Sequence, residues 1–275
     1  MVSDTKQEIH DFFEGAKQGL DDQRKAHDTR LRQETPRFFE GAKQGLDILG
    51  KASVVIDRHL ARRFSTFRYI HLDENCMSDV LADLLRPDSA HGQGDLFLAA
   101  LLKHLRDNEA TQLGMKRILP DDSTWSHPLV YREAPTTHID NRKRRIDIEI
   151  RMSVDGREVG IAIENKPGKK HPPRQLDAYA ENLDKKYKGQ YLLLYLTPTP
   201  ESKPPPPESL PSERQTELGD HFACVSLVEW AKGWLQEAEN QVKASYVQQF
   251  VGDFRQVLLQ KYADAETDPN LTMLS

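Results

Sequence analysis

Three residues near the middle of the chain have the types and spacing of a hydrolytic metal site. Asp147 lies in an alternating apolar and polar stretch, residues 145–152, and Glu164 and Lys166 lie in a second stretch, residues 159–166. Because alternate residues of a strand share a face, a hairpin of these stretches would bring the three side chains together.

The chemistry of this group follows from its charges. Carboxylates crowded together repel one another, and they persist most readily where a hard divalent cation such as Mg²⁺ takes their oxygens. A lysine two residues beyond such a carboxylate can orient an attacking water and stabilise charge growing on a phosphoryl group. The spacing therefore predicts metal-assisted phosphoryl chemistry.

The elements that must position these residues are expected in the order helix, strand, strand, strand, helix, strand. Asp73 can cap a first helix that Pro87 ends, and Asp155-Gly156 supplies the turn between the two alternating stretches. The expected strands are 130–134, 145–152, 159–166, 190–196 and 222–227, and the further helices are 96–105, 174–183, 228–235 and 242–262. Residues 201–215, with four consecutive prolines, are expected to form an exposed insertion.

The N-terminal part carries a perfect repeat. The decapeptide Phe-Phe-Glu-Gly-Ala-Lys-Gln-Gly-Leu-Asp occurs at 12–21 and again at 38–47, with its apolar residues at helical spacing. Thr35-Pro36 is typical of a helix start, which predicts two helices. We expect a helical arm over 1–60, a main domain over 61–265 and a polar tail over 266–275. The arm either packs on the main domain or serves self-association or a partner protein.

Composition excludes several classes of protein. The 275 residues are 37% hydrophobic with a formal net charge of −5, which argues against a protein that coats nucleic acid. The longest apolar run, residues 191–196, is far shorter than a membrane span, and the first residues do not resemble a leader, so we expect a cytoplasmic protein without a membrane partner. Cys76 and Cys224 have no metal-type spacing and are expected to be reduced thiols.

Ile146-Asp147, a gap, and Glu164-Asn165-Lys166 resemble the motif of the PD-(D/E)XK nuclease superfamily, with isoleucine in place of its proline. Gln175 and Tyr179 are similar to the Gln-x-x-x-Tyr motif of its RecB-like branch. Residues 74–98 are similar to the N-terminal part of an uncharacterised family of this superfamily in which Ile-Glu-Asn-Lys ends the third strand. The resemblance covers about 70–260 and implies a restriction-endonuclease-like α/β core, with a mixed sheet flanked by helices.

The resemblance also implies roles. Asp147 and Glu164 would hold Mg²⁺, for which Mn²⁺ could substitute, and Lys166 would be the catalytic lysine. Gln175 and Tyr179 would position the substrate or the lysine.

Three further residues are candidates for completing the metal site. Glu74 and Glu133 compete as an additional acid, although each could be an ordinary charge at a helix end or strand edge. His91 resembles the upstream histidine of RecB-like members, or it is a local hydrogen-bonding residue. Glu149 is expected only to balance Arg145 or Arg151.

Basic residues flank the predicted site and would attract phosphates in a salt-dependent manner. They are Arg142, Lys143, Arg144, Arg145, Lys169, Lys170 and Arg174. Because the superfamily includes restriction, repair and anti-phage nucleases, the resemblance implies a magnesium-dependent deoxyribonuclease acting in DNA processing or antiviral defence. The alternative is a catalytically silent module that binds nucleic acid or a partner protein. The sequence leaves open whether the substrate is DNA or RNA and whether cleavage is endonucleolytic or exonucleolytic. It also leaves open the base specificity, the activating trigger or partner and the oligomeric state.

Overall fold

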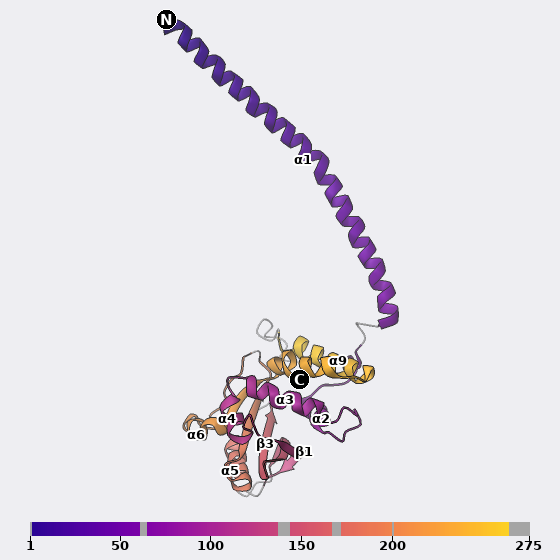
Figure 1. The fold of residues 1–275 in the computed structure, drawn as a ribbon, viewed down its shortest axis with the longest axis vertical. Coiled ribbons are helices and arrows are strands. Elements are labelled where there is room, and N and C mark those ends of the chain that lie inside the picture. The colour runs from indigo at the N-terminus through magenta and orange to yellow at the C-terminus, as the bar shows by residue number, and fades with distance from the viewer. Residues whose placement is uncertain (1, 61–64, 137–143, 167–171, 200, 264–275) are drawn as a thin grey trace. The chain divides into compact units, whose positions relative to one another are not determined.

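A five-stranded mixed sheet forms the centre of the unit Thr66–Ser275 in the computed structural model, which describes residues 2–60, 65–136, 144–166, 172–199 and 201–263 (Figure 1). The strands lie in the order β1 (Trp125–Pro135), β2 (Arg145–Val154), β3 (Arg157–Asn165), β4 (Tyr191–Thr197) and β5 (Phe222–Ser226). The pairs β1–β2 and β2–β3 are antiparallel, whereas β3–β4 and β4–β5 are parallel. The predicted α/β core with a mixed sheet is confirmed.

The β2–β3 hairpin sets the register that matters for the site. Ile148 pairs with Ile163, and the same register continued by one residue places Asp147 opposite Glu164. The turn residues Asp155 and Gly156 have φ values of 49° and 80°. Two positive φ values are what a type I′ turn requires, and this turn matches the twist of the strands it joins. The local turn chemistry therefore fixes which residues face each other across the hairpin.

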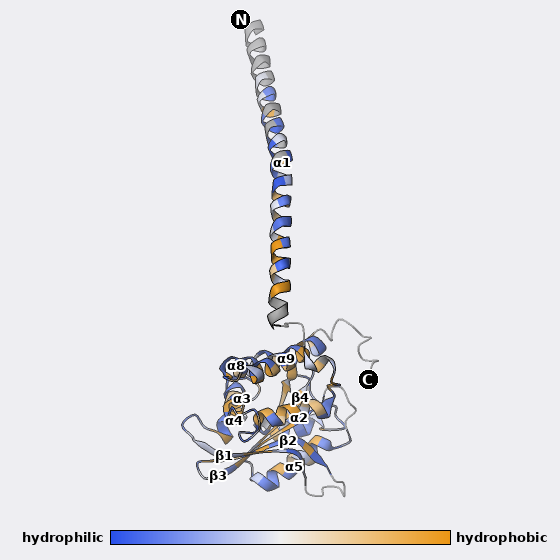
Figure 2. Ribbon diagram, turned by 90° about the vertical axis from the view of Figure 1, so that its right-hand side faces the viewer, coloured by the Kyte–Doolittle hydropathy of each residue, from blue (hydrophilic) through white to orange (hydrophobic). Residues whose placement is uncertain are grey.

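Helices cover both faces of the sheet, and alternate strand residues face the two layers (Figures 1 and 2). One layer packs against Leu192, Leu194 and Leu196 of β4, and its helices are α2 (Glu74–Leu85), α3 (Leu96–Asp107), α4 (Gln112–Ile118), α7 (Leu227–Lys232), α8 (Trp234–Gln241) and α9 (Ser245–Tyr262). The opposite layer contains α5 (Gln175–Tyr187) and α6 (Ser212–Leu218) and packs against Leu193 and its neighbours. Among the described residues of this unit, Thr66–Arg68 and Gly219–His221 form short 3₁₀ helices.

The proline-rich segment is exposed over much of its length, as predicted, but it is also anchored to the core at Ser209. Ser209 is fully buried, and its carbonyl and hydroxyl oxygens accept the backbone N–H groups of Asp177 and Leu176 at 3.4 Å each. The N–H of Arg174 bonds to the carbonyl of Glu208 at 2.6 Å. The first N–H groups of a helix lack hydrogen-bond acceptors within the helix, so this segment supplies acceptors for the first N–H groups of α5. The segment therefore supports the start of α5.

The unit Met1–Ser65 contains one helix, α1 (Val2–Leu60), of 59 residues with Pro36 inside it, where two helices were predicted (Figure 1). A proline removes a single backbone hydrogen bond, and a helix can continue past it by bending.

Cys76 and Cys224 are both free and half-buried. Across the described residues, every helix is too short or too polar to cross a membrane.

Candidate active site

Four elements meet where the predicted site residues lie. Asp147 lies near the start of β2, Glu164 near the end of β3, and Lys166 directly after β3. Glu74 is the first residue of α2, and Gln175 is the first residue of α5. We call these five residues the carboxylate cluster. Both helices begin here, and helix N-termini favour nearby negative charge.

Lys166 connects two acids of the cluster. Its Nζ lies 2.7 Å from Glu74 Oε1 and 3.0 Å from Glu164 Oε1, and all three side chains are less than 10% exposed. Burial by itself lowers the pKa of Lys166, but the charge of Glu164 and the bond to Glu74 outweigh it, so the pKa lies above its usual value. The lysine is therefore a fixed cation between two carboxylates.

Glu164 is the most deeply buried acid of the cluster. Its Oε1 also accepts a hydrogen bond from Gln175 Nε2 at 2.8 Å, whereas its Oε2 is buried and has no hydrogen-bond donor among the described residues. Burial, and then the charge of Asp147, raise the pKa of Glu164 to about 8. A buried acceptor without a donor is costly, so the site favours a group that can fill this position.

Asp147 is held from two sides. Its Oδ2 accepts the backbone N–H of Asn165 at 2.9 Å, and its Oδ1 lies 3.8 Å from Arg132 Nη1. Burial raises the pKa of Asp147, although Lys166 and the bond from Asn165 oppose the shift. The carboxylate is thus oriented by backbone and side-chain donors before anything binds.

Arg132 of β1 was not predicted as part of the site. Its Nη1 donates to the carbonyl oxygen of Asp147 at 3.1 Å, and its Nε donates to Asp79 Oδ1 at 2.7 Å. Its Nη2 reaches Asn75 at 3.4 Å, so one guanidinium connects β1, β2 and α2. The sequence signal that could have revealed Arg132 is a basic residue on the strand expected next to the strand that carries Asp147.

Asn165 is a second positioning residue. It lies within the Glu164-Asn165-Lys166 motif, but the sequence analysis predicted no role for it. Its Nδ2 donates to Ser78 Oγ at 3.1 Å and to the carbonyl of Glu74 at 3.4 Å. These bonds anchor the start of α2 on the end of β3. The position of the Glu74 carboxylate therefore depends on Asn165.

Gln175 and Tyr179 lie together as their four-residue spacing predicted. Gln175 Nε2 lies 2.9 Å from Tyr179 Oη, which in turn donates to the carbonyl of Arg145 at 2.5 Å. Burial, and then the charge of Glu164, raise the pKa of Tyr179, so it stays a neutral donor. The pair orients Glu164 from the side of α5.

Two candidate ligands are not brought into the cluster. Glu133 is half-exposed, has a φ of 51°, and its Oε2 pairs with Arg145 Nη1 at 2.6 Å. His91 bonds to its own loop, because Nδ1 accepts the N–H of Gln93 at 3.0 Å and Nε2 lies 3.0 Å from the carbonyl of Arg86. Both side chains have local partners in the structure.

Glu149 also differs from the prediction. Its buried carboxylate pairs with Lys186 and Tyr187 of α5, whereas Arg145 pairs with Glu133 and Arg151 pairs with Glu158. The prediction that it balances Arg145 or Arg151 is wrong because α5 packs on this face of β2. Glu149 lies outside the carboxylate cluster, as expected.

The predicted basic residues divide into three groups. Arg142, Lys143, Lys169 and Lys170 lie outside the described residues. Arg144 is buried and its Nη2 donates to the carbonyl of Pro173 at 2.8 Å, so it joins segments of the fold. The side chains of Arg145 and Arg174 are 64% and 54% exposed and pair with acids of this chain.

The donor set suits a small hard cation. Within the described residues, no three His, Cys, Asp or Glu side chains form a ready-made metal cage. Asp147 and Glu164 nevertheless present two carboxylates side by side, and the buried Glu164 Oε2 needs a partner. Mg²⁺ is commonly bound by one or two carboxylates together with water and substrate phosphates. These two residues therefore fit a magnesium ion.

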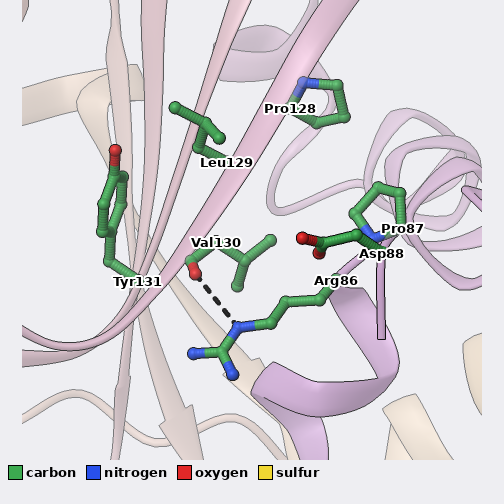
Figure 3. Close-up of a pocket in the computed structure, with 7 residues that line it drawn as sticks. All are labelled: Arg86, Pro87, Asp88, Pro128, Leu129, Val130 and Tyr131. Carbon is green, nitrogen blue, oxygen red and sulfur yellow. Dashed lines mark hydrogen bonds between the residues drawn. The ribbon is translucent and has the colours of Figure 1, made fainter. Parts of the chain in front are cut away.

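A separate cavity of about 530 Å³ lies between the C-terminal end of α2 and β1 (Figure 3). Arg86 crosses its base and donates to the carbonyl of Val130 at 3.2 Å, and Leu129 and Tyr131 belong to the same strand. None of the residues lining it belongs to the carboxylate cluster. The cavity and the candidate site are thus different features.

Comparison with known proteins gives one match. The sequence model of the PD-(D/E)XK nuclease superfamily matches residues 64–256. Searches among curated proteins and among solved structures gave no match. The matched range contains every residue of the carboxylate cluster.

Proposed function

Since the chain belongs to the PD-(D/E)XK nuclease superfamily, we propose that it is a divalent-metal-dependent nuclease that hydrolyses phosphodiester bonds in DNA. The observation that carries the proposal is the carboxylate cluster, in which two strand carboxylates lie beside one buried lysine. A binding module has no need of an acid as deeply buried and as incompletely bonded as Glu164.

Asp147 and Glu164 are the proposed ligands of Mg²⁺ or Mn²⁺. When bound, such an ion supplies a Lewis acid that polarises the phosphoryl oxygen and lowers the pKa of a bound water. The bonds from Asn165 and Gln175 hold the two carboxylates in place, so little reorganisation is needed when the ion arrives.

Lys166 is the proposed catalytic lysine. Its raised pKa keeps it protonated, so its N–H groups can orient the attacking water and stabilise negative charge on the phosphoryl group. Glu74 and Glu164 hold its Nζ from two sides, which limits the positions it can take. Glu74 thereby acts through the lysine as a positioning residue.

Arg145 and Arg174 are proposed to contact the DNA backbone on either side of the cluster. Arg145 pairs with the half-exposed Glu133, and a surface pair of this kind is weak enough to exchange for a phosphate. Arg174 is held by Asp177, whose side chain is 12% exposed, at 2.8 Å, and it can release the more exposed Glu181. Arg142, Lys143, Lys169 and Lys170 continue the two basic segments in the sequence. Binding should therefore weaken as salt concentration rises.

A cleavage panel tests the proposal. Linear, circular and single-stranded DNA and RNA are incubated with Mg²⁺ or chelator, using the wild type, Lys166→Ala and Lys103→Ala. Lys103 is an exposed lysine paired with Glu237 at the surface, so it serves as the matched control. We expect metal-dependent DNA cleavage that falls by about 10²–10³-fold or more in Lys166→Ala, with DNA binding changed only several-fold.

Two outcomes would contradict this proposal. Undiminished cleavage by Lys166→Ala would remove the lysine from the reaction. DNA binding without cleavage by the wild type under every metal condition would favour the catalytically silent module instead. Preferential cleavage of RNA would correct the substrate.

A further inference from the structure

Three carboxylate residues lie in one row across the first three strands of the sheet. The β1–β2 pairs on either side of Glu133 keep a single register, which places Glu133 opposite Asp147. Asp147 in turn lies opposite Glu164 in the register of β2 and β3. Neighbouring strands lie about 4.8 Å apart, so the backbone of the row spans only about 10 Å. We call Glu133, Asp147 and Glu164 the acidic row.

The side chain of Glu133 is directed to Arg145 rather than to Asp147. Its Oε2 lies 2.6 Å from Arg145 Nη1, and its φ of 51° is uncommon for a residue other than glycine inside a strand. Like charges directly opposite each other on neighbouring strands are destabilising. Repulsion from Asp147 therefore accounts for both the backbone conformation of Glu133 and its choice of partner.

The pair between Glu133 and Arg145 can exchange for another pair. The side chains of Arg145 and Glu133 are 64% and 50% exposed, and exposed ion pairs contribute little to stability. The backbone of Arg145 is fixed independently, because its carbonyl accepts a hydrogen bond from Tyr179 Oη at 2.5 Å. The guanidinium can therefore exchange the Glu133 carboxylate for a phosphate, whose geometry it matches, without a movement of β2.

The other two members of the acidic row have oxygens that a cation can fill. Glu164 is 1% exposed, and its buried Oε2 has no hydrogen-bond donor among the described residues. Asp147 Oδ2 accepts the N–H of Asn165, whereas Oδ1 lies 3.8 Å from Arg132 Nη1, beyond hydrogen-bonding distance. A divalent cation at these oxygens changes the local charge from repulsive to attractive for a third carboxylate.

We propose that Glu133 becomes a third metal ligand when a DNA phosphate replaces it at Arg145. The proposal rests on the proposed function, from which it takes the DNA contact at Arg145. Glu133 is one strand spacing from Asp147, a distance that a glutamate side chain can cover. DNA and metal then bind cooperatively, and each raises the affinity for the other by the same factor.

A double-mutant cycle without DNA tests the exchange. Free Mn²⁺ is counted by electron paramagnetic resonance with the full chain as wild type, Arg145→Ala, Glu133→Gln and the double variant. Arg145→Ala removes the partner of Glu133, so we expect the Kd for Mn²⁺ to fall by about fivefold or more. In the Glu133→Gln background the same substitution should have a clearly smaller effect. An equal or larger effect in that background would show simple loss of a positive charge and overturn the proposal.

Arg151→Ala is the matched control for this cycle. Arg151 also lies on β2 and pairs with an acid, Glu158, at 3.2 Å, but neither residue belongs to the acidic row. We expect its replacement to change the Kd for Mn²⁺ by less than about twofold. A fall as large as that of Arg145→Ala would show that the affinity follows net charge alone, which would also overturn the proposal.

A measurement with DNA tests the coupling itself. The Kd for Mn²⁺ is measured for wild type and Glu133→Gln with and without a duplex whose phosphorothioate linkages resist cleavage. The duplex should lower the Kd of the wild type by about fivefold more than that of Glu133→Gln, because phosphates near the ion act equally in both chains. An equal effect of DNA on both would overturn the coupling and leave the nuclease proposal intact. The nuclease proposal fails separately, through absence of cleavage in the panel above.

Discussion

The carboxylate cluster and helix α1 depart from the usual distribution of side chains in opposite ways. In the cluster, charged groups are buried, with Glu164 only 1% exposed. In α1, large apolar groups are in water, with Phe38 72% exposed. A buried polar group and an exposed apolar patch are the two informative deviations from ordinary burial.

The two regions differ in what each needs. Most polar atoms of the cluster are held by this chain, whereas Glu164 Oε2 and Gln175 Oε1 are buried without a hydrogen-bond partner among the described residues, and an ion can fill the position beside Glu164 Oε2. Helix α1 instead exposes large apolar side chains, such as Leu46 and Leu49 at 70% and 67%. The comparison teaches that the first region is prepared for a small ligand, whereas the second leaves apolar surface that only contact with another surface would cover.

The largest effect expected in this comparison comes from Arg132, which holds the cluster together. Arg132→Ala removes the donor to the Asp147 carbonyl and leaves Asp79 without its closest cation. Losing a residue that orients a metal ligand typically costs 10–100-fold in activity or metal affinity. We expect kcat and the affinity for Mg²⁺ to fall by about that factor, measured by cleavage kinetics at several metal concentrations.

Arg255→Ala is the control for that experiment. Arg255 is as buried as Arg132 and pairs with Glu239 at 2.8 Å, away from the cluster. Its replacement should lower stability without changing the metal dependence of cleavage. If both variants change metal dependence equally, Arg132 acts only through general stability.

A smaller effect is expected from removing α1. Deletion of residues 1–60 should change the melting temperature of the unit Thr66–Ser275 by less than roughly 4 °C, because the buried residues of both cores lie between Phe67 and Tyr262. Calorimetry of the full chain and of the truncated chain measures this difference. An insoluble or unfolded product would show that α1 belongs to the core and would break the distinction between the two regions.

Local patterns were enough to predict most of the sheet. The alternation in β2, the Asp-Gly turn and the apolar run in β4 each depend on neighbours in sequence, and all three are confirmed. The juxtaposition of Asp147 and Glu164 followed from the same hairpin.

What the sequence did not predict depends on contacts between distant segments. Arg132 reaches α2 across 53 residues, and Ser209 completes α5 across 33 residues. The single helix α1 was missed for a different reason, because Pro36 is equally compatible with a helix start and with a bend. Periodicity predicts elements, but it does not predict which side chains connect them.

The most direct test of the central claim is a melting series that needs no substrate. Wild type, Asp147→Asn and Glu164→Gln are melted in chelator, Mg²⁺ and Mn²⁺, with Glu133→Gln as the control carboxylate outside the cluster. An ion that binds only the folded state adds about 2.7 kcal/mol at 100 times its Kd, or roughly 5–10 °C for a unit of this size.

We predict that metal raises the melting temperature of the wild type and of Glu133→Gln. If substrate phosphates normally complete the metal site, the shift without substrate should be larger with Mn²⁺ than with Mg²⁺. Asp147→Asn and Glu164→Gln should lose that shift, yet be no less stable than the wild type in chelator, because burial and a neighbouring acid disfavour the charged form of each carboxyl group, as the raised pKa of both shows. If both variants keep the full wild-type response to metal, these carboxylates do not form the site, and the account is contradicted.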